Sequence, residues 1–97
     1  MTDSIEIQHE GSASEGRYFA AIEGSEPQAE LTWTDRGGVR HATHTFVPPA
    51  LRGRGIAARL VEAMLADARA QGFRIAPDCS YVRGYFDDRP ELADLRA

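Results

Sequence analysis

The chain has 97 residues, of which 42% are hydrophobic and 27% charged, and its formal net charge is −4. Residues 1–97 are therefore expected to form one domain with one modest core, and no apolar run reaches the roughly 18 residues that a membrane-spanning helix needs. The negative charge argues against nucleic-acid binding, which requires a basic face to displace counterions from phosphates.

The N-terminal sequence and the cysteine content indicate a cellular compartment. The N-terminus lacks the basic start and the apolar stretch of a secretory signal. Cys79 is the only cysteine, so it has no partner for an intrachain disulfide. Both features predict a cytoplasmic protein. We expect a monomer or a weak homodimer, because an open sheet edge can pair with a second copy.

Alternating apolar residues in the first half of the chain predict an antiparallel meander of four strands. These strands are expected over residues 5–10, 17–23, 29–33 and 39–47. Glycine and proline mark the intervening turns, which are expected over residues 11–16, 23–27 and 35–38. Pro48 and Pro49 end the fourth strand, because neither can donate a hydrogen bond to the ladder.

The second half of the chain predicts helix and strand in alternation. Apolar residues recur at spacings of three and four from Ile56 to about Gln71, which indicates an amphipathic helix that ends at Gly72. A short buried strand is expected over residues 73–76, with Pro77 as its stop. The order strand, helix, strand predicts that this strand lies parallel to the fourth, through a right-handed crossover.

Asp78 is expected to cap a second, shorter helix over residues 79–86, and a final short turn is expected over residues 90–95. The sequence therefore predicts an α+β fold with a mixed, mostly antiparallel sheet. One long helix follows the fourth strand, and one short helix follows the fifth.

A glycine- and arginine-rich loop, Arg52 to Gly55, lies between the fourth strand and the long helix. Backbone N–H groups at a helix start have no helical partners and the macrodipole is positive there, so such a loop binds anions. Glycine lets a phosphate approach the backbone, and arginine adds charge and bidentate hydrogen bonds. We expect a pyrophosphate-containing cofactor here. The alternative is a tight turn with two solvated arginines.

Two other phosphate-binding motifs compete for this loop. A Walker loop needs Gly-Lys-Ser/Thr at the helix start, which the sequence lacks. A dinucleotide-binding fingerprint is matched by Gly53, Gly55 and Ala58, with Asp78 about twenty residues further on. That fingerprint follows its strand almost at once, whereas residues 48–51 intervene here. Too little chain follows to build the rest of the dinucleotide-binding fold.

The pattern Arg52-x-x-Gly55-x-Ala57 resembles the acetyl-CoA signature Q/R-x-x-G-x-G/A of the GNAT superfamily of amino-group N-acetyltransferases. Three further blocks follow the order and spacing of a minimal branch of that superfamily: His44 to Pro48, Pro77 to Val82, and Pro90 to Leu95. The resemblance implies a GNAT-like fold without the helices that larger members place between their first two strands, and without their last hairpin. Those parts normally shape the acceptor pocket, so the acceptor stays open.

The resemblance also implies a cofactor, acetyl-CoA, and the residues that bind it. The backbone at Phe46 and Val47 would line the pantetheine arm. The loop would hold the CoA pyrophosphate through Arg52, Gly53, Arg54, Gly55, Ile56 and Ala57. The implied activity is acetyl transfer to a primary amine of a small molecule or of a protein lysine, and no metal is expected. The alternatives are a CoA-binding or adaptor module without chemistry, and a thiol-dependent interaction protein built around Cys79.

Cys79 is a candidate nucleophile, because it lies near the expected start of the second helix, whose field favours the thiolate. The resemblance associates the minimal branch with a cysteine at this position, so an acetyl-cysteine intermediate is one possible route. The alternative is a small packed side chain beside the thioester. Asp78, one residue away, would oppose formation of the thiolate.

The other route is direct attack of a neutral amine on the thioester, with an acid that protonates the CoA sulfur. Larger GNAT enzymes use a tyrosine on the second helix as this acid, which makes Tyr85 the first candidate and Tyr81 the alternative. His44 and His41 lie on the strand where larger members carry a basic carboxylate. Their odd separation predicts opposite faces, and His44, in the recognised block, is the candidate base. Each of these side chains also has a purely structural interpretation.

Overall fold

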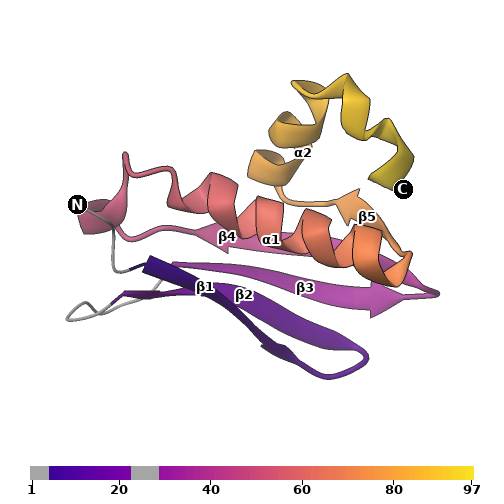
Figure 1. Cartoon of the computed structure of the whole chain (residues 1–97), viewed down its shortest axis with the longest axis horizontal. Helices are drawn as coiled ribbons and strands as arrows, with labels where there is room; N and C mark the ends of the chain where they lie inside the picture. The colour runs from indigo at the N-terminus through magenta and orange to yellow at the C-terminus, as the bar shows by residue number, and fades with distance from the viewer. Residues whose placement is uncertain (1–4, 23–28) are drawn as a thin grey trace.

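Five strands form a mixed sheet in which each strand neighbours the next in the sequence (Figure 1). The computed structural model describes residues 5–22 and 29–97. The first four strands pair antiparallel, and the fifth pairs parallel with the fourth. The strands are β1 (Ile5–Gly11), β2 (Glu15–Ile22), β3 (Glu30–Arg36), β4 (Val39–Phe46) and β5 (Arg74–Pro77). The expected meander and the parallel final pairing are both confirmed.

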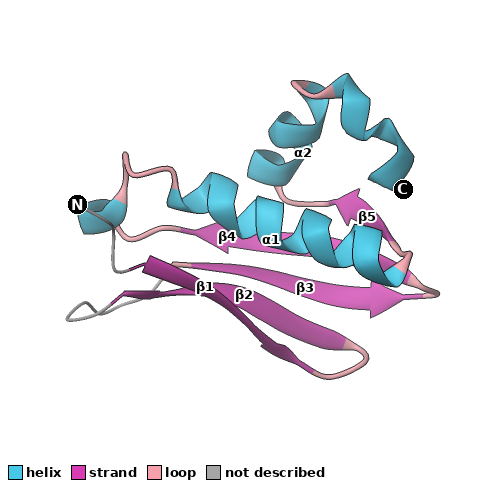
Figure 2. Cartoon of the chain, in the orientation of Figure 1, coloured by secondary structure: helices cyan, strands magenta, loops and turns pink. Residues whose placement is uncertain are grey.

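Within the described residues, two α-helices lie on one side of the sheet: α1 (Ile56–Gln71) and α2 (Ser80–Asp87) (Figures 1 and 2). A hydrogen bond of 3.3 Å from the Tyr85 hydroxyl to the Glu62 carboxylate joins the two helices. Short 3₁₀ helices, η1 (Pro49–Leu51) and η2 (Pro90–Leu95), precede α1 and follow α2. No helix in residues 5–22 and 29–97 is long and apolar enough to cross a membrane.

The core lies between α1 and the face of the sheet beneath it, which we call the inner face. Trp33 and Leu31 from β3 are fully buried there against Leu60 and Met64 of α1. The spacing of four between these two helix residues places them on one stripe, as the sequence predicts. The opposite face, which we call the outer face, carries mainly polar side chains.

A buried arginine, Arg40, contacts several side chains of the inner face. The guanidinium of Arg40 lies 3.7 Å from the ring centre of Trp33 and 4.1 Å from that of Phe73. It also donates a hydrogen bond of 2.8 Å to the Tyr18 hydroxyl, which in turn donates one of 2.7 Å to the Asp67 carboxylate on α1. Phe73 therefore acts as a packing residue just before β5, whereas the sequence placed it inside that strand.

The hairpin between β1 and β2 is tighter than expected. The sequence predicts a break from Gly11 to Gly16, but both glycines belong to strands and face each other as a cross-strand pair. A Cβ at Gly16 would lie 2.5 Å from the Glu10 carbonyl oxygen and 2.7 Å from the Trp33 ring. These glycines are therefore needed because the indole packs directly over their backbone.

The remaining boundaries differ from expectation by a few residues. The strand β3 continues into the expected third turn, so that only Gly37 and Gly38 form it, with φ of 59° and 83°. Paired positive φ values at both central residues are typical of a two-residue hairpin loop. The strand β5 includes Pro77, which ends it without having to donate a ladder bond. The turn expected over residues 23–27, and the end of the second strand at Glu23, lie outside the described residues.

Candidate functional site

The arginine–glycine loop joins η1 to the start of α1. Gly53 and Gly55 have φ of 84° and 73°, a left-handed conformation that glycine adopts without steric cost. Gly55 is the N-cap of α1, and no side chain caps the helix there. The first N–H groups of α1, at Ile56 and Ala57, therefore have no helical partners and remain available for an anion.

The charge of this loop is positive. Arg52 and Arg54 are exposed, and the first turn of α1 contains no acidic residue. The Arg52 Nε donates a hydrogen bond of 3.0 Å to the Val47 carbonyl oxygen, which ties the loop to the end of β4. The loop thus combines the free backbone N–H groups at the start of α1 with two cations, an arrangement that suits a pyrophosphate.

The sheet opens beside this loop. The strand β5 pairs with β4 only from Val39 to Ala42, whereas β4 continues to Phe46. The last backbone link is a hydrogen bond of 2.8 Å from the Cys79 N–H to the Ala42 carbonyl oxygen. No described residue of β5 pairs with the segment from Thr43 to Phe46, so β4 has no strand partner there, and we call this separation of the two strands the gap. Phe46 is 40% exposed there.

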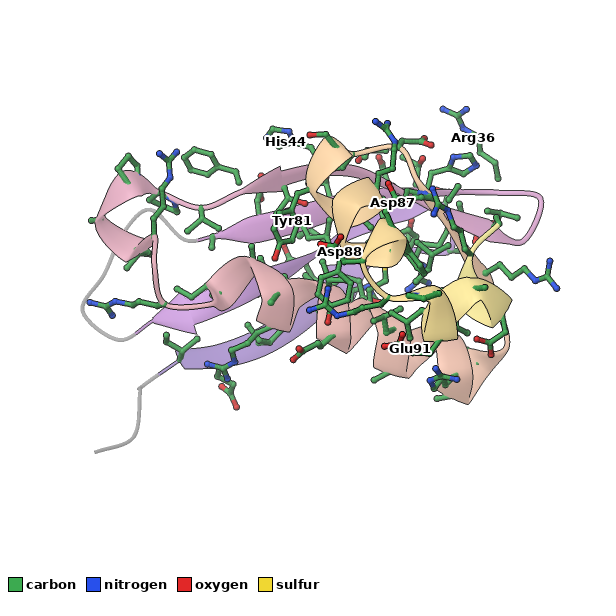
Figure 3. All side chains as sticks on the ribbon, turned by 90° about the horizontal axis from the view of Figure 1, so that it is seen from above. Arg36, His44, Tyr81, Asp87, Asp88 and Glu91 are labelled. Carbon is green, nitrogen blue, oxygen red and sulfur yellow. The ribbon has the colours of Figure 1, made fainter. Side chains whose placement is uncertain are left out.

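A groove of about 460 Å³ separates the first turn of α1 from α2. Its walls are Ala58 on α1 and, on α2 and just beyond it, Ser80, Tyr81, Gly84, Tyr85, Asp88 and Arg89. Figure 3 shows Tyr81 on the side of α2 that faces the arginine–glycine loop. The groove therefore lies beside the loop, on the inner-face side of the sheet.

Cys79 lies at the gap between β4 and β5. Its thiol donates a hydrogen bond of 3.3 Å to the Thr45 hydroxyl oxygen. Burial acts to raise the pKa of this thiol, but the Thr45 hydroxyl and backbone groups of Val82, Tyr81 and Thr45 outweigh it, so that the Cys79 pKa is lower than usual. The expected bias toward thiolate is therefore present, although burial opposes it.

The expected cap of the second helix is wrong. The N-cap of α2 is Cys79 rather than Asp78, and the helix starts at Ser80. The carboxylate of Asp78 instead lies 2.9 Å from the Nδ1 of His41 on β4. Asp78 therefore faces a histidine, and its side chain is not directed at the helix amides.

The two candidate acids lie four residues apart on α2 and line the same groove. Tyr81 is 41% exposed, whereas Tyr85 is 8% exposed. Burial raises the pKa of both phenols, the Glu62 carboxylate raises it further in each, and the Arg89 charge opposes the increase. Both hydroxyls are thus protonated at neutral pH, as an acid must be. The choice between them stays a prediction.

The two histidines of β4 lie on the same face, which contradicts the expectation from their odd separation. In the β3–β4 ladder, Thr34 pairs with His41 and Thr32 pairs with His44, while Thr43 is left over as a bulge. Directly paired residues point to the same face, and Thr32 and Thr34 share the outer face because they are two apart. His41 and His44 are therefore both on the outer face.

Their environments differ. His44 is exposed at the rim of β4 (Figure 3), and its imidazole has no hydrogen-bond partner among the described residues. The His41 side chain is 21% exposed and is held by Asp78. Sequence reasoning preferred His44 and missed both the His41–Asp78 pair and the contact of Thr45 with Cys79. The sequence did contain a signal for Thr45, because this residue belongs to the block from His44 to Pro48.

Two comparisons with known proteins bear on this site. The model of the GCN5-related N-acetyl-transferase family matches residues 17–95 of the chain. The fold matches that of a GCN5-like protein from Staphylococcus aureus, determined by NMR in solution, with a TM-score of 0.73. The sequences are 21% identical, and the match covers 100% of this chain and 91% of that one. The structural likeness confirms the expected α+β fold.

Proposed function

Since the chain belongs to the GCN5-related N-acetyl-transferase family, we propose that it transfers the acetyl group of acetyl-CoA to a primary amine. Membership in the family confirms the prediction of an N-acetyltransferase. Acetyl-CoA as the donor and a primary amine as the acceptor are what we propose. The observation that carries it is the opening between β4 and β5, which ends at a positively charged helix start. An extended thioester with a pyrophosphate at one end matches both features.

The residues present fit acetyl-CoA in three places. The pyrophosphate would bind the N–H groups at the start of α1, with Arg52 and Arg54 as counter-charges. The pantetheine arm would lie along the free edge of β4, beside the backbone of Phe46 and Val47, and donate and accept the hydrogen bonds that β5 does not supply there. The thioester would then reach the end of the gap. It would supply the activated acetyl group for transfer.

The chemistry that these residues support best is direct transfer. Cys79 and Thr45 lie at the closed end of the gap, where the thioester would sit. Tyr81 and Tyr85 line the adjoining groove, and either phenol can protonate the departing sulfur. A covalent acetyl-cysteine route is the second candidate, favoured by the lowered pKa of Cys79.

A CoA-binding module without catalysis would use the same loop and the same gap. Binding is therefore measured first, by thermal melting with acetyl-CoA and with NAD and ATP as controls. A ligand at 100 times its Kd adds about 2.7 kcal/mol to stability. Release of free CoA in the presence of primary amines then separates the enzyme from the binding module. Absence of any selective shift with acetyl-CoA would overturn the donor assignment.

A further inference from the structure

We propose that His41, held by Asp78, accepts the proton of the acceptor amine, and that the acceptor approaches over the outer face of the sheet. The inference rests on the acetyltransferase function proposed above and adds a base and a side of approach to it. His41 and Asp78 lie 37 positions apart in the sequence and meet at the end of β5.

The contact with Asp78 selects one tautomer of the neutral His41 imidazole. The Nδ1 of His41 lies 2.9 Å from an Asp78 carboxylate oxygen. Because an ionised carboxylate can only accept hydrogen bonds, the neutral imidazole in this contact carries its hydrogen on Nδ1 and its free lone pair on Nε2. A carboxylate that orients a histidine in this way is the arrangement by which serine hydrolases prepare their general base. The Nε2 of His41 is therefore ready to accept a proton.

Both members of the pair are held by rigid elements. His41 sits within the sheet, paired with Thr34 of β3 on one side and with Ala76 of β5 on the other. The backbone of Asp78 donates to the Ala76 carbonyl oxygen at 3.0 Å and accepts from Arg83 of α2 at 3.0 Å. A general base works best when its own supports fix its orientation, and this pair meets that condition. The imidazole of His44 has no comparable support.

The pair lies where transfer would occur. His41 precedes Ala42, whose carbonyl oxygen accepts the Cys79 N–H at the last link before the sheet opens. Asp78 precedes Cys79. His41 and Asp78 therefore each lie one residue before a residue of this last backbone link. The groove beside α2 lies on the inner-face side, whereas His41 lies on the outer face, so the two substrates would meet from opposite sides of the sheet.

A hollow of about 550 Å³ on the outer face gives the acceptor room to approach. Thr43, the bulged residue between His41 and His44, forms part of its wall, together with Thr32 and Thr34. Its acidic residues are Glu10 and Glu15. Glu10 is compensated by Arg17 at 2.7 Å, whereas Glu15 forms no ion pair with any described residue. The hollow thus favours a small cationic amine.

Glu15, Thr34 and His41 are in register across β2, β3 and β4. Neighbouring strands are about 4.8 Å apart, so Glu15 and His41 lie about 10 Å apart along this row. An acceptor with a second cationic group at a comparable distance from its reactive amine can contact both residues. A diamine therefore fits the row better than a monoamine of equal length.

Acetyl transfer to the amine exchanges one covalent bond for another. The amine nitrogen attacks the acetyl carbonyl carbon, a C–N bond forms and the C–S bond breaks. The proton lost by the nitrogen passes to Nε2 of His41 and from there to water. The departing CoA thiolate takes a proton from one of the groove phenols or from water. The products are an N-acetyl amine and free CoA, with no oxidant or reductant.

The test measures CoA release by the full chain with 1,7-diaminoheptane and with heptylamine, between about pH 6.5 and about pH 9.5, and the diamine should have the higher kcat/KM. For His41→Gln we expect kcat/KM to fall about 100-fold or more near neutral pH. This loss should shrink toward pH 9.5, because solvent can then take the proton. For Asp78→Asn we expect kcat/KM to fall about tenfold, with the same pH dependence. Acetyl-CoA affinity should be unchanged in both variants.

The matched control is Asp94→Asn, which removes a 65% exposed carboxylate on η2 and should leave kcat/KM unchanged. Added imidazole should restore part of the activity of His41→Ala, a recovery that a structural role cannot produce. Wild-type kcat/KM in His41→Gln, or a loss that is independent of pH, would overturn this inference alone. Absence of CoA release by the unmodified protein, despite bound acetyl-CoA, would overturn the proposed function as well.

Discussion

The Cys79 thiol lies 3.3 Å from the Thr45 hydroxyl oxygen, across the gap where β4 and β5 separate. This contact joins Cys79, at the closed end of the gap, to the part of β4 that continues beyond β5. A group bound at this end of the gap would therefore contact both side chains. It also ties the protonation of the cysteine to the threonine, because the hydroxyl is the largest of the influences that lower the pKa of the thiol.

Thr45→Val should therefore raise the pKa of Cys79, because valine keeps the shape of the side chain but removes the hydroxyl. Alkylation of Cys79 by iodoacetamide at neutral pH should become slower, since only the thiolate reacts. Thr43→Val removes an exposed hydroxyl from the same strand and serves as the control. Equal alkylation rates in Thr45→Val and in the unmodified protein would contradict the role of the Thr45 hydrogen bond.

Cys79→Ala separates direct from covalent transfer. We expect this variant to keep most of the kcat for CoA release, because direct attack by the amine does not require a thiolate. A covalent route predicts instead that Cys79→Ala loses the activity entirely and that an acetylated Cys79 peptide accumulates when the amine is omitted. Mass spectrometry of the unmodified protein after incubation with acetyl-CoA distinguishes the two.

Gly55→Asp should abolish acetyl-CoA binding, because a carboxylate at the N-cap of α1 would repel the pyrophosphate. Gly55→Asn is the matched control, since asparagine and aspartate have the same shape and both tolerate the left-handed φ of 73° found here. No atom lies within 4 Å of a Cβ at this position, so neither change produces a clash. Equal Kd values for the two variants in a calorimetric titration would rule out an anion at this helix start.

Gly16→Ala should destabilise the fold by about 2–3 kcal/mol, because the added Cβ overlaps the Glu10 carbonyl oxygen and the Trp33 ring. Gly84→Ala is the control, because its Cβ would meet no atom within 4 Å and alanine favours a helix over glycine by about 1 kcal/mol. In urea unfolding, Gly16→Ala should have a lower free energy of unfolding than the unmodified protein, and Gly84→Ala a higher one. A neutral Gly16→Ala would contradict the close packing of Trp33 on the hairpin.

Stability should fall as the pH drops below about 6.5, the ordinary value for histidine, because of His9. Burial, and then the Arg40 charge, lower the pKa of His9 in the folded protein, although Asp67 and Glu10 oppose this. The unfolded chain therefore binds the proton first, and folding free energy is lost until folded His9 also titrates. Protonation also removes the acceptor for the hydrogen bond of 3.1 Å from the Trp33 Nε1.

His9→Gln supplies the control for this pH dependence, because its amide oxygen can still accept from Trp33 but does not titrate. Its unfolding free energy, measured from about pH 7.5 to about pH 5.5, should vary less than that of the unmodified protein. If the unfolding free energy changes equally with pH in both proteins, groups other than His9 cause the loss of stability.

Local patterns were sufficient for most of the fold. The spacing from Ile56 to Gln71 fixed α1 and the glycine that ends it, and the loop from Arg52 to Gly55 is where the sequence placed it. Helix periodicity and glycine turns depend on residues that are close together in the chain, so they can be seen without the structure. The same is true of the parallel pairing of β4 and β5, which follows from the order of the elements.

The histidines show where such reasoning ends. The period of two applies only while the ladder is regular, and the bulge at Thr43 depends on how β4 pairs with β3, which no local pattern reports. The contact of His41 with Asp78 joins residues 37 positions apart, and each is unremarkable in its own neighbourhood. The sequence by itself determined most of the elements, their order and the position of the arginine–glycine loop, because short-range geometry dictates them. The tertiary structure decided which polar side chains meet, because only the packed sheet brings those residues together.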